Sequence, residues 1–140
     1  MTTLRAVLDR IIPADEWPSA TQAGVDRFVL ALWRNGSDTS EAETLAGFAA
    51  LDALAQETAS ESFAGCSEAL QDAMLAAFTE APWFRHLCEL AAEGFYANPA
   101  NGANPDAASW RMVGYRHGLP EGPDGPPADP TEARIGRLWA

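Results

Sequence analysis

Apolar residues recur every three or four positions through most of the first 95 residues, the spacing that places them on one face of an α-helix. Residues 4–12 carry the first such stripe, and Pro13 ends the short helix that the stripe predicts. A second stripe covers residues 25–33. It follows Ser19 and Gln22, whose spacing is that of a capping box. The pattern therefore predicts two helices joined by a polar turn.

Three more helices are expected downstream. Ser40 and Glu43 repeat the capping-box spacing before a helix that runs to about Thr58. Ser67 can cap a fourth helix, and Pro82 fits the first position of a fifth. The residues expected on the apolar side of these helices are Leu45, Phe48, Leu51, Leu54, Leu70, Ala73, Met74, Ala77, Phe78, Phe84, Leu87, Cys88, Ala91 and Phe95. No stretch alternates with the period of a strand, so the fold class is all-α, a bundle of about five short helices.

The character of the sequence changes after Tyr96. Asn-Pro and Asn-Gly pairs give three turn signals in residues 98–106, and a short segment with Trp, Arg, Met and Tyr follows at 110–115. Residues 116–140 are rich in Pro and Gly and largely acidic, which predicts an extended C-terminal arm with weak helical character at its end, or else a disordered tail. We therefore divide the chain into a helical domain, residues 1–115, and an arm, residues 116–140.

Charge narrows the classes of partner. The 140 residues include 9 basic and 20 acidic side chains, which gives a net charge of −11, and every basic residue is arginine. Such a charge disfavours nucleic acid and anionic membrane surfaces. No run approaches the roughly 18 apolar residues that a membrane span needs. The N-terminus shows no export signal, so a cytoplasmic location is expected, or a periplasmic one if a signal was trimmed or lies on a partner.

Catalytic signatures are missing from the sequence. His86, Cys88, Glu89 and Glu93 are the nearest approach to a metal cluster, but Cys88 should point away from His86 and Glu89 on a helix. Cys66 and Cys88 are expected to be reduced thiols in apolar surroundings. There is no G-x-S-x-G elbow, no G-x-G-x-x-G fingerprint and no C-x-x-C-H haem motif. We therefore expect no catalytic, cofactor-binding or metal-ligating residue, and a protein that acts by binding.

Trp110 and Arg111 are the sharpest candidates for binding, since Trp and Arg lead the residues that dominate protein interfaces. Two interpretations remain open from the residues alone. The pair can dock onto a partner, or Trp110 and Met112 can close the open end of the bundle while Arg111 pairs with a nearby acid.

Two separated motifs resemble one known family. Residues 93–115 read E-G-F-Y-x-N-P-x-x-G-x-N-x-D-x-x-x-W-R-M-x-G-Y, which resembles the C-terminal signature of the gluconate 2-dehydrogenase subunit 3 family. Residues 4–18 read L-x-x-x-L-D-R-I-I-P-A-D-x-W-P, and A-G-V-D follows at 23–26; both are similar to the opening segment of that family. The resemblance covers roughly residues 4–115.

The resemblance implies a non-catalytic small subunit. Members of the family bind, stabilise and help to mature a large FAD-dependent dehydrogenase subunit of the glucose-methanol-choline type, which oxidises sugars, polyols or gluconate. FAD is thus expected in the partner and not in this chain, and a multihaem cytochrome c subunit often completes the complex. Family members commonly carry a twin-arginine signal, which this sequence lacks. The alternative is a stand-alone helical enzyme or ligand-binding protein with an unrecognised site.

The partner-binding surface is assigned to the C-terminal motif, where the residues shape the loop and dock onto the large subunit. Its members are Phe95, Tyr96, Asn98, Pro99, Gly102, Asn104, Asp106, Trp110, Arg111 and Tyr115.

Overall fold

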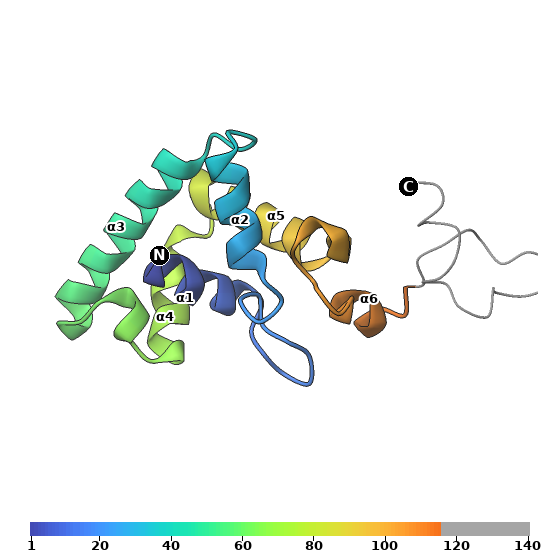
Figure 1. The fold of residues 1–140 in the computed structure, drawn as a ribbon. Helices are drawn as coiled ribbons and strands as arrows, with labels where there is room; N and C mark the ends of the chain where they lie inside the picture. The colour runs from blue at the N-terminus through green and yellow to red at the C-terminus, as the bar shows by residue number, and fades with distance from the viewer. Residues whose placement is uncertain (116–140) are drawn as a thin grey trace, which may run out of the picture. The chain divides into compact units, whose positions relative to one another are not determined.

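The computed structural model describes residues 1–115 of the chain, and within them it contains helices and turns but no strand (Figure 1). The α-helices are α1 (Thr2–Ile11), α2 (Val25–Arg34), α3 (Glu41–Ala59), α4 (Glu68–Leu75), α5 (Pro82–Phe95) and α6 (Ala108–Met112). Short 3₁₀ turns lie at η1 (Phe63–Gly65), η2 (Ala76–Phe78) and η3 (Pro99–Asn101). The all-α prediction is confirmed, and α6 is a helix that the sequence pattern did not indicate.

Contacts divide the chain into a compact unit, Met1–Ser109, and a second unit that begins at Trp110. Each is described below by itself. The extended arm expected at residues 116–140 lies outside the described residues, and the domain boundary placed after residue 115 stays a prediction.

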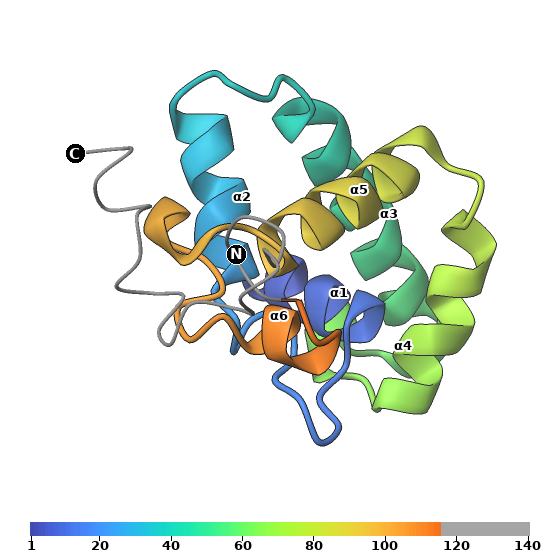
Figure 2. The ribbon, with the colours of Figure 1, turned by 90° about the vertical axis from the view of Figure 1, so that its right-hand side faces the viewer.

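Helix α1 lies at the centre of the first unit, with α2, α3, α4 and α5 around it (Figure 2). Leu4, Val7 and Leu8 are buried almost completely, as the apolar stripe predicted. Arg10, on the same helix, joins α1 to α4 through ion pairs with Glu68 at 2.9 Å and Asp72 at 2.8 Å. The ten-residue helix α1 thus contacts four other helices and contributes buried side chains to the core.

Two of the predicted helix starts are confirmed. The hydroxyl of Ser67 accepts a hydrogen bond from the Leu70 N–H at 3.4 Å, which caps α4. Pro82 occupies the first turn of α5, where its missing N–H needs no partner.

The expected start of the second helix is wrong, although its capping box forms. Ser19 N–H donates to the Gln22 side chain at 2.9 Å, and Gln22 N–H donates to the Ser19 hydroxyl at 3.3 Å. These bonds close a turn at residues 20–24, and α2 begins only at Val25. The reason is Gly24, whose φ of +79° interrupts the helical backbone.

The capping box expected at Ser40 is also wrong. Ser40 precedes α3 but makes no side-chain cap, because its hydroxyl donates to Asp38 instead. Within α3, the expected burial of Leu45 is wrong as well, since its side chain is 43% exposed. The buried stripe of α3 runs through Thr44, Gly47 and Leu51, and Leu45 lies about 100° around the helix from Thr44.

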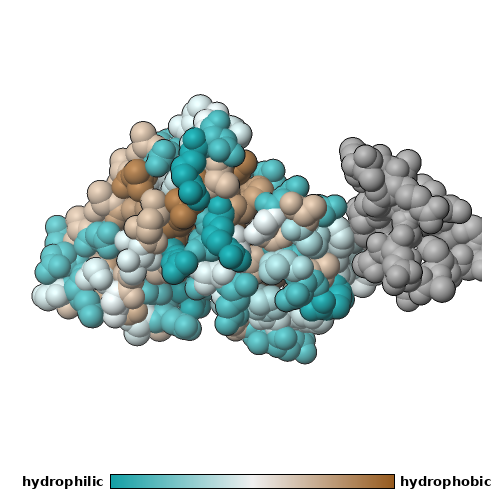
Figure 3. All heavy atoms as spheres, in the orientation of Figure 1, coloured by the Kyte–Doolittle hydropathy of each residue, from teal (hydrophilic) through white to brown (hydrophobic). Residues whose placement is uncertain are grey.

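The outer face of α3 is therefore apolar. Ala42, Ala46 and Ala49 are exposed beside Leu45. Figure 3 shows apolar side chains gathered where Figure 1 draws the upper part of α3. The inner face meets α5 closely, because a Cβ on Gly47 would stand 2.4 Å from the Trp83 ring. Glycine at this position allows the two helices to approach.

Candidate functional site

The loop between α5 and α6 is organised by Asn104. Its side chain is 1% exposed, and its backbone has the left-handed φ of +50° that Asn tolerates better than most residues. The Asn104 N–H donates to the Ala23 carbonyl at 2.7 Å, and its amide donates to the Ala97 carbonyl at 3.0 Å. The amide oxygen accepts from the Ser109 N–H at 3.3 Å. One side chain thus fixes both ends of the loop.

Two glycines bring this loop against the turn before α2. Gly24 and Gly102 both have positive φ, at +79° and +86°. A Cβ on Gly24 would stand 3.5 Å from the Gly102 carbonyl oxygen and 2.9 Å from a guanidinium nitrogen of Arg27. The two motifs that are far apart in the sequence, at residues 23–26 and 93–115, therefore meet at residues 23–24 and 102–104.

The start of the loop is also locally ordered. The Asn98 side chain accepts a hydrogen bond from the Ala100 N–H at 3.0 Å and caps η3, in which Pro99 is the first residue. Tyr96 is 45% exposed, and its ring packs edge to face on Phe95 with centroids 5.3 Å apart. A loop with this many internal bonds presents its exposed side chains in a defined arrangement.

The segment that begins at Trp110 is closed on itself. The Trp110 and Tyr115 rings meet edge to face with centroids 5.2 Å apart, and the Tyr115 N–H donates to the Trp110 carbonyl at 2.7 Å. Gly114, with a φ of +68°, makes the reversal possible. Whether Trp110 serves a partner or the bundle itself stays a prediction.

The residues assigned to the partner-binding surface differ in exposure. The exposed residues are Tyr96, Gly102, Asp106, Arg111 and Tyr115; Asn98, Pro99 and Trp110 are half-buried; Phe95 and Asn104 are buried. Buried side chains shape the loop from within, whereas the exposed residues contribute to the surface of the described part of the chain.

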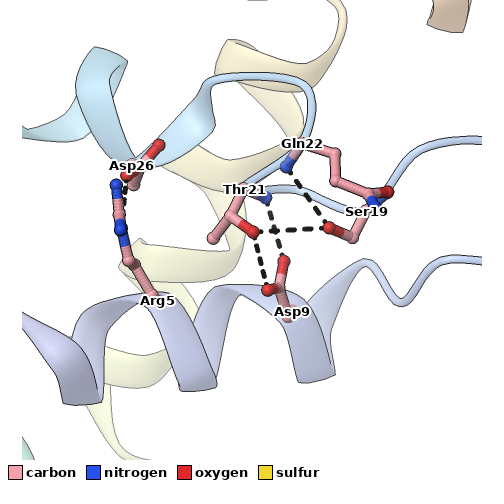
Figure 4. Close-up of polar contacts among 6 residues, drawn as sticks. All are labelled: Arg5, Asp9, Ser19, Thr21, Gln22 and Asp26. Atoms are coloured by element: carbon pink, nitrogen blue, oxygen red, sulfur yellow. Dashed lines mark hydrogen bonds and ion pairs between the residues drawn. The ribbon is translucent and has the colours of Figure 1, made fainter.

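The N-terminal motif forms a polar network that sequence reasoning did not interpret (Figure 4). Asp9 on α1 accepts hydrogen bonds from the N–H and the hydroxyl of Thr21, at 2.9 and 2.7 Å. Arg5, one turn earlier, donates to Asp26 at 2.7 Å, and the Asp26 side chain is only 4% exposed. The carboxylates of the motif therefore tie α1 to the turn and to the start of α2, on which the loop rests.

An open hollow of about 260 Å³ lies beside this network, between the first turns of α1 and α2. It is lined by Met1, Thr2, Leu4, Arg5, Asp26, Arg27 and Leu30.

His86 belongs to a second polar cluster. Its Nε2 lies 2.5 Å from Asp38, and its Nδ1 lies 3.5 Å from Glu89. Asp38 also accepts from the Ser40 N–H at 2.8 Å and from the Trp33 indole at 3.2 Å. The sequence indicated Glu89 as a neighbour, but Asp38 was missed because it lies far away in the chain.

Electrostatics in this cluster favour an ion pair. The hydrogen bond to Asp38 raises the pKa of His86 above its ordinary 6.5, and this outweighs the opposing effect of burial. Burial alone would raise the pKa of Asp38, but the hydrogen bonds from Ser40 and His86 prevail and lower the pKa to about 2. The protonated form of His86 is thus favoured by the two carboxylates that face its ring nitrogens.

The histidine and the cysteines do not gather into a metal-binding group in the described part of the chain. The two carboxylates face opposite nitrogens of the His86 ring, and residues 1–115 contain no group of three side chains suited to a metal ion. Cys66 and Cys88 are free thiols. Burial raises the pKa of Cys88, as does the nearby Glu89 to a smaller degree, which disfavours a nucleophilic thiolate.

The helices of residues 1–115 include none that combines the length and the apolar character needed to cross a membrane.

Comparison with known families gives a match over most of the chain. The family model described as Gluconate 2-dehydrogenase subunit 3 matches residues 1–118, which include both motifs and every helix described above. No curated protein and no solved structure matches the chain significantly.

Proposed function

The chain belongs to the gluconate 2-dehydrogenase subunit 3 family, and from this premise we propose that it binds and stabilises a large FAD-dependent dehydrogenase subunit of the glucose-methanol-choline type. The family name itself describes one subunit of a multi-subunit dehydrogenase, which points to an accessory role. In the proposed complex, FAD and the oxidation of a sugar, polyol or gluconate belong to the large subunit.

The observation that carries the proposal is the family match over residues 1–118. The geometry of the loop supports it. Asn104 and the two facing glycines hold the loop on the α1–α2 turn, so little conformational entropy remains to be lost when a partner binds. Tyr96, Arg111 and Tyr115 are exposed residues of the types enriched at interfaces.

The experiment is co-expression of the chain with the cognate large flavoprotein subunit, followed by measurement of their affinity. Replacing both Trp110 and Arg111 by alanine should weaken capture of the large subunit about tenfold or more, with the far-UV circular dichroism unchanged. Arg85→Ala on the outer face of α5 is the matched control, because Arg85 is 68% exposed and makes only a long ion pair with Glu80.

Three results would count against this function or against the docking role of Trp110 within it. Intrinsic dehydrogenase turnover, or flavin bound to the chain alone, would support a stand-alone enzyme. A double variant that loses its fold, with no separate effect on binding, would assign Trp110 to the bundle's own packing. Release of the chain once the flavoprotein has folded would indicate a free chaperone and not a resident subunit.

A further inference from the structure

Arg27 differs from the other arginines of the first unit. Arg5 and Arg10 bond to carboxylates, and Arg85 lies 3.8 Å from Glu80. Arg34 donates to a carbonyl of its own helix. Among residues 1–115, no hydrogen bond or ion pair engages the exposed Arg27 guanidinium. Within residues 1–115 of this chain, whose net charge is −11, Arg27 thus offers a guanidinium group that is not engaged in an ion pair.

The Arg27 guanidinium lies between the hollow and the loop that joins α5 to α6, which we call the candidate docking loop. Arg27 lines the hollow between α1 and α2. Its guanidinium also lies beside Gly24, at the point where the Gly102 carbonyl of the loop approaches. Arg27 therefore stands at the border of both features, and a partner seated on the loop would reach it.

The lining of the hollow indicates what it would accept. Arg5 and Asp26 are bonded at 2.7 Å and neutralise each other, which leaves Arg27 as the remaining charged side chain of the lining. Leu4 and Leu30 supply apolar walls. A guanidinium presents a planar fork that matches a carboxylate, and apolar walls reduce the screening of such a pair by water.

We propose that this hollow receives an acidic side chain of the large dehydrogenase subunit, an Asp or Glu flanked by an apolar residue, with Arg27 as the anchor of its carboxylate. The inference rests on the proposed function, because it assumes the large subunit as the partner. It adds a second contact surface beside the loop and gives that surface its chemistry.

The test measures the affinity of the purified full-length chain for the large subunit at two salt concentrations. Arg27→Met keeps most of the apolar stem and removes the guanidinium, and Arg27→Glu reverses the charge. Arg85→Glu makes the same change of charge on α5 and serves as the control. The Arg27 side chain is exposed, so the thermal midpoints of the variants should match that of the wild type.

We expect Arg27→Met to raise Kd about tenfold and Arg27→Glu to raise it further, both with a weaker dependence on salt, while Arg85→Glu stays within about twofold of the wild type. Wild-type affinity in Arg27→Met would overturn this inference and leave the proposed function standing. Failure of the wild-type chain to bind the large subunit would overturn the proposed function, and the inference with it.

Discussion

At the scale of single residues, two positions decide how closely the elements approach each other. Gly47 lets α3 meet Trp83 on α5, and Asn104 joins the loop to the turn before α2. Neither role follows from the local sequence, because the neighbours that matter are distant in the chain. Substitutions at both positions should therefore act through contacts between elements and not through local preferences.

Gly47→Ala should destabilise the fold although alanine favours helix by about 1 kcal/mol over glycine. The new Cβ would stand 2.4 Å from the Trp83 ring, and such overpacking costs about 1–3 kcal/mol. We expect a net loss of up to about 2 kcal/mol in urea unfolding and a changed near-UV circular dichroism spectrum. Gly36→Ala is the comparison, since no atom lies within 4 Å of its Cβ and only the positive φ is strained. An increase in stability for Gly47→Ala would contradict the packing argument.

Asn104→Gly should lower the free energy of unfolding by about 1–3 kcal/mol, because the Ala97 carbonyl and the Ser109 N–H lose their partner. Asn104→Ala should lose about 1 kcal/mol more, since alanine resists the φ of +50°. The exposed Asn101→Ala serves as the control. Denaturant titration with hydrogen exchange of the loop amides measures both effects. Equal stability of the three variants would show that the Asn104 bonds contribute little.

At the scale of elements, the cluster of Asp38, Ser40 and His86 fastens the α2–α3 connection to α5. The charged groups facing His86 are Asp38 from that connection and Glu89 from α5 itself. Because both are anions, the cation is stabilised only in the folded state, and the stability of the connection should depend on pH.

The direction of the pH dependence of stability follows from the two pKa shifts. Since the pKa of His86 is raised, its contribution is full below 6.5 and is lost as pH rises through the raised value. Since the pKa of Asp38 is lowered to about 2, its contribution is full above 3.8 and is lost as pH falls toward 2. The pair therefore contributes most between about pH 4 and 6.5.

His86→Gln should accordingly reduce stability more at pH 5.5 than at pH 8.5. The difference should be about 0.5–1 kcal/mol, because the histidine is partly exposed and water screens the pair. Urea unfolding of wild type and variant at the two pH values measures it, and Arg85→Gln controls for the loss of an exposed cation. If His86→Gln lowered the free energy of unfolding by the same amount at both pH values, the histidine would have a packing role only.

At the scale of the whole molecule, the first unit depends on α1, which packs against α2, α3, α4 and α5. The same helix carries Arg5 and Asp9, which position the turn under the candidate docking loop. Core and candidate surface therefore share one element, and damage to α1 should affect both together.

Leu8→Ala should destabilise the first unit by about 2–5 kcal/mol, because Leu8 is fully buried at the centre of the bundle. Tryptophan fluorescence and far-UV circular dichroism should report one coincident unfolding transition. Leu45→Ala, at an exposed apolar position, should change stability by less than about 0.5 kcal/mol. Separate transitions for the two probes in Leu8→Ala would contradict the central role of α1.

Local signals in the sequence predicted the elements well. The apolar stripe of α1, the serine cap of α4 and the proline at the start of α5 all act within one or two helical turns, so their consequences do not depend on the rest of the fold. The family, too, was identified from the residues of the two motifs and is confirmed by the match over residues 1–118. The assignment of the partner-binding residues remains a prediction.

The tertiary structure decided which hydrogen-bond partners the Ser40 hydroxyl and the Asn104 N–H have. The Ser40 hydroxyl could cap α3 or donate to Asp38, and in the structure it donates to Asp38. The same carboxylate is bound by His86 from α5, a contact that depends on the tertiary structure. Likewise, nothing near Asn104 in the chain indicates that its N–H reaches Ala23. The sequence by itself determined five of the six α-helices and the family, because those signals are short-range. The meeting of the two motifs and the position of Arg27 between the hollow and the loop depend on packing between segments distant in the chain.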